Sequence, residues 1–230
     1  MDHSRARDRA DLAIDHDALY RHRFGPEESA GRAALWHEIG RHLQRYIPLD
    51  SVVLDLGAGS GNFIANIKAR ERWASDLRDT SAEMPADIKF VCSDGLTLRG
   101  AVPMGHFDRI FMSNYLEHLP SPKAVVEQLA VVRDLLIVGG QVIILQPNIR
   151  LTGGHYWDFI DHHTPLTERS LAEAALTAGL EPTKTIVRFL PYTTKSRLPQ
   201  AAWLVRAYLA FPPIWRLMGK QTLFIAERST

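Results

Sequence analysis

Several features that would assign this chain to a common functional class are missing from its sequence. There is a single cysteine, Cys92, so an internal disulfide framework is excluded and a reducing compartment is expected. The formal net charge is only +1, and charges of both signs are interspersed, so the sequence lacks a basic footprint for nucleic acid. We therefore expect a cytoplasmic protein that does not act on DNA or RNA.

Long apolar runs are also missing. Residues 1–11 lack the apolar core of a secretory signal. The most apolar late segment, residues 201–218, is interrupted by two arginines and two prolines and falls short of the ~18 uninterrupted apolar residues that a membrane span needs. The 230 residues suffice for one domain with a sizeable core, so we expect a soluble single-domain protein.

The most informative stretch that is present is VVLDLGAGSGNFI, residues 52–64. Its first three residues are apolar and mostly β-branched, which is typical of a strand buried on both faces of a parallel sheet. Asp55 follows, and then glycines in a GxGxG spacing, which let the chain turn sharply and a ligand approach the backbone. Phe63, Ile64 and Ile67 recur at helical intervals, so we predict a strand, a glycine turn and a helix.

Other ligand-binding glycine motifs match this stretch poorly. A dinucleotide fingerprint would need a small residue where Asn62 stands, and the Gly-Lys-Ser/Thr of a P-loop is missing. An acid two places before GxGxG resembles the first motif of the class I methyltransferases that depend on S-adenosyl-L-methionine (SAM). The resemblance implies that SAM is the cofactor and S-adenosyl-L-homocysteine the product.

Two further acids end predicted strands. Asp76 lies about twenty residues past the glycines, where a carboxylate can bind the ribose hydroxyls of a nucleoside. Asp94 ends the next strand, and by the resemblance it accepts from the adenine amino group. In the run NYLEHL, which resembles the fourth methyltransferase motif, Asn114 is expected to approach the amino-acid end of SAM through its backbone. The cofactor-binding residues expected within the domain are Asp55, Gly57, Ala58, Gly59, Gly61, Asp76, Leu77, Asp94, Gly95 and Asn114.

Strand and helix patterns alternate along the chain. Further strands are expected at residues 72–78, 88–95, 110–113, 141–147, 183–190 and 221–228, and helices at 27–47, from Ser121 to Leu136 with Gly139 and Gly140 ending it, and from Thr167 to Gly179. This order predicts an α/β fold, a doubly wound, seven-stranded, mostly parallel sheet with helices on both faces. Right-handed crossovers would bring the acids and glycines together at one sheet edge.

Two segments flank the predicted SAM-binding domain, residues 51–230. Residues 1–50 are expected to form a tail and lid helices, from which Tyr20 and Arg23 could reach the methionine end of SAM. Residues of about 190–220 form a long insertion between the last two strands, rich in aromatic side chains. The insertion is expected to cap the active site as a roof. The alternative is that it contacts a membrane surface, a partner or a second copy of the chain.

The acceptor side is expected in the loop after residue 147, which holds three histidines, His155, His162 and His163, with Asp158 and Asp161 available to orient one of them. Transfer to a hydroxyl needs a base, and histidine titrates near neutrality. His162 and His163 are adjacent, so only one can be that base. The alternatives are a purely structural loop, or a metal site. No metal is expected, because the spacing matches no metal motif. His118 more commonly would pack or meet solvent than act in catalysis.

We therefore predict O-methylation of a small molecule, a sugar or a lipid-linked precursor. N-methylation of a small molecule is one alternative. An NAD-dependent oxidoreductase would also use Gly57, Gly59 and Asp76, but it leaves Asp94 unexplained. A non-catalytic scaffold that keeps the SAM-binding fold is a third alternative.

Overall fold

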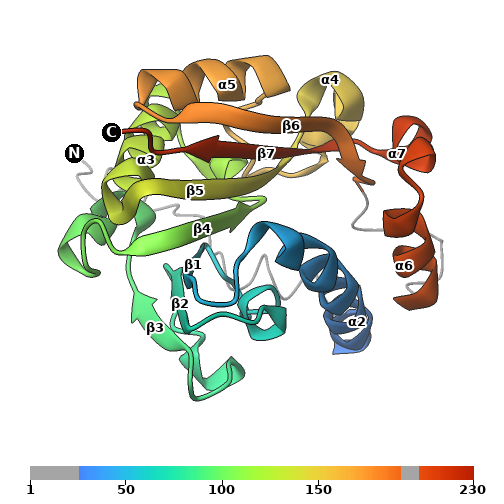
Figure 1. Ribbon diagram of the computed structural model, residues 1–230. Helices are drawn as coiled ribbons and strands as arrows, with labels where there is room; N and C mark the ends of the chain where they lie inside the picture. The colour runs from blue at the N-terminus through green and yellow to red at the C-terminus, as the bar shows by residue number, and fades with distance from the viewer. Residues whose placement is uncertain (1–25, 193–201) are drawn as a thin grey trace, which may run out of the picture.

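A computed structural model describes residues 26–192 and 202–230, and its centre is a seven-stranded sheet (Figure 1). The strand order is β3-β2-β1-β4-β5-β7-β6, and only β7 runs antiparallel to its neighbours. The predicted doubly wound, mostly parallel sheet is confirmed. The strands are β1 (Val52–Leu56), β2 (Glu71–Asp76), β3 (Lys89–Cys92), β4 (Phe107–Ser113), β5 (Leu136–Pro147), β6 (Glu181–Leu190) and β7 (Gln221–Glu227).

Helices cover both faces of the sheet (Figure 1). On one face α3 (Pro122–Leu135) and α5 (Glu168–Thr177) pack over a core that includes Leu129 and Leu171. On the other face lie α2 (Pro26–Leu43), α6 (Ala202–Ala210) and α7 (Pro212–Met218). The predicted starts of α3 and α5 are confirmed, because Ser121 and Thr167 cap these helices by accepting hydrogen bonds from the first turn of each.

The predicted helix after the glycines is wrong. The nine residues 62–70 contain only the 3-10 turn η2 (Ile64–Asn66) before β2 begins. A crossover that includes a helix usually needs at least ~10–12 residues, so this segment is too short. The N-terminal helix α2 covers that region instead: the Phe63 and Phe111 rings stack at 3.6 Å, and Trp36 of α2 meets both edge-on.

Gly139 and Gly140 do not end a helix, as the sequence had predicted. Helix α3 ends at Leu135, and β5 begins directly and contains both glycines. A Cβ on Gly140 would lie 2.8 Å from the Ile137 carbonyl oxygen of its own strand and 3.0 Å from that of Phe107, next to a register shift between β4 and β5. The glycine is therefore needed for close approach of two strands, which short-range periodicity does not reveal.

The described part of the insertion packs on the sheet face beside α2. Leu209 of α6 and Trp215 of α7 are buried in the same core as Ile39, and Arg206 donates two hydrogen bonds to Glu38 of α2. Trp203 and Leu217 are exposed, which leaves the alternative of a partner or membrane surface open. Residues 193–201 lie outside the described part, so the roof over the active site stays a prediction.

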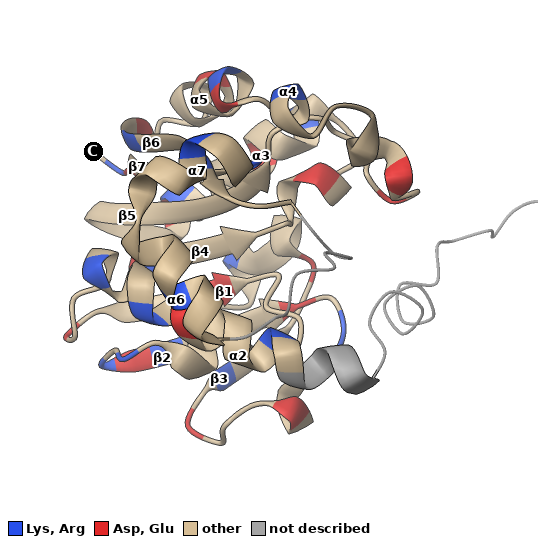
Figure 2. Cartoon of the chain, turned by 90° about the vertical axis from the view of Figure 1, so that its right-hand side faces the viewer, with Lys and Arg blue, Asp and Glu red and all other residues tan. Residues whose placement is uncertain are grey.

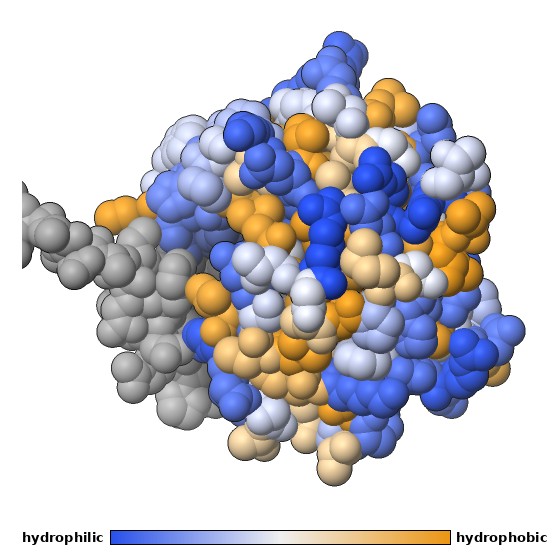
Figure 3. All heavy atoms as spheres, turned by 90° about the vertical axis from the view of Figure 1, so that its left-hand side faces the viewer, coloured by the Kyte–Doolittle hydropathy of each residue, from blue (hydrophilic) through white to orange (hydrophobic). Residues whose placement is uncertain are grey.

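The surface agrees with the composition. Figure 2 shows charged residues of both signs spread over the described chain. Figure 3, which shows the side of the molecule where β7 ends, has polar and apolar side chains interspersed. No helix within residues 26–192 or 202–230 combines the length and the apolar character needed to cross a bilayer.

Candidate active site

The glycine loop joins β1 to η2 at the carboxyl edge of the parallel strands. Its glycines Gly57, Gly59 and Gly61 have φ values of 73°, 54° and 70°, and the backbone N–H groups of Gly57 and Ala58 both donate to the Ser75 carbonyl. A Cβ on Gly57 would lie 2.5 Å from the Tyr115 ring, whereas a Cβ on Gly59 would meet no atom of the described residues within 4 Å. Gly59 thus faces open space, in which a ligand could approach the loop.

Asp76 ties the glycine loop to the end of β2. One of its carboxylate oxygens accepts from the Gly59 N–H at 2.8 Å, and the other accepts from the Arg78 N–H at 3.0 Å. Both oxygens keep further lone pairs for ligand hydroxyls. Asp94 follows the neighbouring strand β3, is exposed, and caps the turn η4 (Gly95–Gly100) by accepting from Leu96.

Asp55 lies at the end of β1 and is 3% exposed. Burial raises its pKa to about 8, opposed by a hydrogen bond from the Ile64 backbone and reinforced by the negative charge of Asp76. The folded protein therefore holds the Asp55 proton at neutral pH, whereas the unfolded chain releases it above pH 4. A cationic ligand at this edge would favour ionisation of Asp55.

This burial predicts a pH-dependent stability difference for Asp55→Asn. Because the pKa is raised in the folded state, the wild-type protein loses stability as pH rises from about 4 to about 8, by at most ~1.4 kcal/mol per pH unit. Asparagine does not ionise, so the variant does not lose stability in this way as pH rises. In urea titrations without cofactor, we expect the variant to gain stability over wild type by a few kcal/mol more at pH 8 than at pH 5. Exposed Asp50→Asn is the control, and an equal gain at both pH values would contradict the assignment.

The turn after β4 is locked to the turn after β3. Tyr115 donates to the Gln128 side chain at 2.9 Å, and Gln128 donates to the Gly95 carbonyl at 3.2 Å. The Asn114 backbone has a φ of 48°, which is uncommon for a residue other than glycine, and its N–H donates to the Leu145 carbonyl. The Tyr115 ring therefore packs under the glycine loop, while Asn114 keeps only its carbonyl to offer a ligand through the backbone. Leu77, also expected at the cofactor, is 62% exposed.

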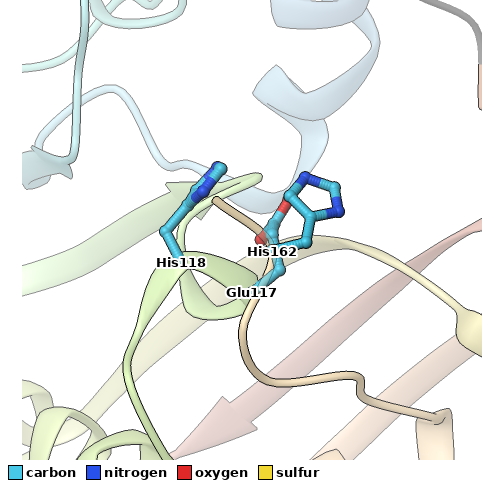
Figure 4. A group of neighbouring side chains, drawn as sticks. All are labelled: Glu117, His118 and His162. Atoms are coloured by element: carbon cyan, nitrogen blue, oxygen red, sulfur yellow. The ribbon is translucent and has the colours of Figure 1, made fainter. Parts of the chain in front are cut away.

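Glu117, His118 and His162 form one group at the same sheet edge. One potential ligand atom from each lies within 4.8 Å of those of the other two (Figure 4). Glu117 and His118 come from the turn η5 (Leu116–His118), and His162 comes from the loop after β5. Glu117 is 1% exposed, and in the part of the chain that the structure describes neither carboxylate oxygen has a partner in good hydrogen-bond geometry. Burial raises its pKa, so this carboxyl is costly to ionise without a positive group beside it.

His118 is paired with Asp161. Its Nδ1 lies 3.0 Å from the Asp161 backbone oxygen and 3.3 Å from a carboxylate oxygen of the same residue. Burial by itself lowers the pKa of His118, but the hydrogen bond to Asp161 and the negative charges nearby outweigh it and raise the pKa to about 8. His118 thus has the orienting acid that the sequence analysis had reserved for a histidine of the later loop.

His162 is held in place from several sides. Its Nδ1 lies 2.9 Å from the Tyr156 carbonyl oxygen, and its ring stacks on Phe159. The loop around it is clamped to the turn after β4, because the backbone N–H groups of His163 and Thr164 both donate to the Glu117 carbonyl. This clamp joins two segments that are far apart in sequence.

The three predicted histidines therefore occupy different environments. His162 is 8% exposed and lies in the group, whereas the His163 side chain is exposed, and His155 is exposed and pairs with Asp158 at 3.2 Å. Sequence reasoning gave His118 little weight and did not select Glu117. The signal for Glu117 was a lone acid between two apolar residues, Leu116 and Leu119, in a turn at a strand end. Two other predicted residues, Tyr20 and Arg23, lie outside the described part of the chain.

Comparison with known proteins gives a consistent family. Residues 24–185 match the family described as methyltransferase domain. The fold is shared with a chain of the complex between the Haloferax volcanii Trm112 methyltransferase activator and the putative methyltransferase. The TM-score is 0.69 and the identity 16%, over 95% of this chain and 100% of that one. No curated protein matches in sequence.

Two further solved structures share the fold. A SAM-dependent methyltransferase from Archaeoglobus fulgidus has a TM-score of 0.61 and 18% identity, over 93% of this chain and 100% of that one. Geranyl diphosphate C-methyltransferase from Streptomyces coelicolor, in complex with Mg²⁺, geranyl diphosphate and S-adenosyl-L-homocysteine, has a TM-score of 0.58 and 14% identity, over 83% of this chain and 76% of that one. These identities establish a common fold only.

Proposed function

Since this chain belongs to the family of class I SAM-dependent methyltransferases, we propose that it transfers a methyl group to a hydroxyl of a small molecule, a sugar or a lipid-linked precursor. The family assignment removes the oxidoreductase alternative. The observation that carries O-methylation is the Glu117, His118 and His162 group, because a hydroxyl, unlike a neutral amine, needs help in losing its proton.

The described residues suit SAM as the cofactor. Open space over Gly59 admits a ligand close to the backbone, and Asp76 offers lone pairs at the position expected for ribose hydroxyls. Asp94 is exposed at the next strand end for the adenine amino group, and buried Asp55 favours the cationic, methionine end. SAM supplies an electrophilic methyl on a sulfonium leaving group. Tyr20 and Arg23 remain proposed lid contacts.

The chemistry asked of the chain is alignment and deprotonation. The acceptor oxygen forms the new bond to the methyl carbon as the carbon–sulfur bond breaks, and the hydroxyl proton leaves to the group at the sheet edge. In the simplest form of this proposal His162 accepts the proton, because its Nδ1 faces the Tyr156 carbonyl and its Nε2 therefore carries the lone pair. His155 and His163 were predicted as bases too, but their exposed side chains give them less support.

An acceptor panel tests the proposal. The full chain is incubated with SAM and matched sets of phenols, sugars, lipid-linked sugars and amines, and formation of S-adenosyl-L-homocysteine is measured. We expect turnover with hydroxyl compounds. Turnover with amines alone would replace the proposal with N-methylation, and tight binding of S-adenosyl-L-homocysteine without turnover on any acceptor would support a non-catalytic scaffold.

The insertion is proposed to help select the acceptor. At its start the Tyr192 ring meets the Phe159 ring in the loop that holds His162, and Trp203 and Phe211 stay exposed in the part that is described. A bulky or lipid-linked acceptor would cover such apolar side chains. Alternatively, the same side chains contact a membrane surface or a second copy of the chain.

A further inference from the structure

We infer that Glu117, His118 and His162 bind a divalent first-row metal ion of the Zn²⁺ or Mn²⁺ type. The binding is argued from geometry alone, while its role in turnover rests on the proposed O-methylation. The three side chains converge from two segments on one region, as Figure 4 shows. The sequence predicted no metal site because two ligands are adjacent and the third lies far along the chain, a spacing that matches no motif.

The distances suit a site that closes on its ion. The three ligand atoms all lie within 4.8 Å of one another. Metal–ligand bonds of ~2.0–2.2 Å put ligand atoms in one coordination sphere roughly 3–4 Å apart. Small side-chain rotations therefore complete the site, without movement of the two clamped backbone segments.

Glu117 supplies the strongest argument for a ligand. It is buried, and within residues 26–192 and 202–230 neither carboxylate oxygen has a partner in good hydrogen-bond geometry; the neighbouring Gln146 amide, which lies close enough to lower the pKa of Glu117, is unsatisfied by the same measure. The great majority of buried polar groups in proteins have a hydrogen-bond partner, and a buried carboxylate is stabilised by pairing or by a metal. A charged His118 ring lies beside this carboxyl, but it leaves both oxygens unsatisfied, whereas a metal ion would bind the carboxylate directly.

The two histidines are oriented as metal ligands usually are. Each has its Nδ1 beside a backbone carbonyl oxygen, that of Asp161 for His118 and that of Tyr156 for His162. In a neutral ring the nitrogen that faces a carbonyl carries the proton, so the ion would displace the second proton of His118 and bind the lone pair on Nε2 of both rings. The Asp161 carboxylate also lies behind His118, which is the outer partner that commonly fixes a metal-ligating histidine.

The ligand set indicates the kind of ion and its use. Two imidazoles and one carboxylate suit Zn²⁺, Mn²⁺ or Fe²⁺ better than Mg²⁺, which prefers oxygen ligands. Three protein ligands leave open positions, and the acceptor oxygen can take one. The ion then lowers the pKa of the hydroxyl, whose proton leaves to solvent before the oxygen attacks the methyl carbon. In this state His118 and His162 are ligands and not the base.

Direct binding tests the inference. The untagged full chain carrying Cys92→Ser, which removes the exposed thiol, is stripped with chelator and equilibrated with Zn²⁺, Mn²⁺ or Mg²⁺. We expect one equivalent of Zn²⁺ or Mn²⁺ and weak binding of Mg²⁺. Asp161→Asn should weaken binding ~10–100-fold, as loss of an outer partner does, and Glu117→Gln or His162→Gln should weaken it more. Exposed His155→Gln is the matched control.

The outcomes separate the inference from the proposed function. Absence of stoichiometric binding, or equal binding in all four variants, overturns the metal site, while intact binding of S-adenosyl-L-homocysteine in the same samples shows that the cofactor site is unaffected. Turnover that falls on chelation and returns with Mn²⁺ or Zn²⁺ supports the catalytic role. Turnover that is insensitive to chelation overturns it and leaves direct deprotonation by a histidine.

Discussion

Replacing His162 with glutamine is expected to lower kcat on the hydroxyl acceptor by ~100–10,000-fold, whether His162 takes the proton itself or holds the ion that lowers the pKa of the hydroxyl. The ring stacks on Phe159 and its Nδ1 faces the Tyr156 carbonyl, so its Nε2 is aimed by contacts that glutamine cannot reproduce. Glutamine keeps much of the volume in this buried position and cannot accept the proton. Steady-state kinetics with SAM and the best acceptor of the panel measure the effect.

The loop provides matched controls for this prediction. His163 is adjacent in sequence and His155 lies seven residues earlier, and both side chains are exposed. His163→Gln and His155→Gln should keep kcat within a few-fold of wild type, and all three variants should bind S-adenosyl-L-homocysteine equally. A loss of kcat in His163→Gln with full activity in His162→Gln would transfer the role to the neighbouring histidine and contradict the geometry.

Replacing Gly59 with valine is expected to weaken binding of S-adenosyl-L-homocysteine by more than ~100-fold, equivalent to about 3 kcal/mol. A Cβ at this position meets no atom of residues 26–192 or 202–230 within 4 Å, so the added side chain enters the space proposed for the cofactor. The φ of 54° adds backbone strain of roughly 1–3 kcal/mol to the folded state. Isothermal titration calorimetry measures the affinity, and thermal unfolding measures the stability.

Gly105 offers a closely matched control for the strain. Its φ is 56°, and a Cβ on it would also meet no described residue within 4 Å, but it lies in the turn that precedes β4, at the opposite end of that strand. Gly105→Val should lose a similar amount of stability and bind the ligand as the wild type does. Equal loss of affinity in both variants would mean that strain, and not occupation of the cofactor space, causes the effect.

The sheet and its edge could be predicted because their signals are local. A β-branched run such as Val52 and Val53 predicts a buried strand, and an acid or glycine at its end follows in the next few residues. The prediction of a helix after the glycines was wrong because it, too, used only a local signal. The spacing of Phe63, Ile64 and Ile67 also fits a short turn packed against Phe111 and α2, and only the distance to β2 excludes a helix.

The acceptor side could be predicted only in part. The sequence placed histidines in the loop after β5, but which of them turns inward depends on the turn η6 (Gly153–Asp158) and on the clamp to Glu117. The partners His118 and Asp161 lie 43 residues apart, and the sequence around one of them does not indicate contact with the other. A cluster assembled by tertiary contacts leaves no periodic trace in a single sequence.

A crystal structure of the full chain with S-adenosyl-L-homocysteine tests the central claim most directly. We predict adenosine over Gly59, with the ribose at Asp76 and the adenine amino group at Asp94. The sulfur should be directed toward Glu117 and His162, with room between for one acceptor. A ligand bound away from the glycine loop, or a sulfur directed away from that group, would contradict the account.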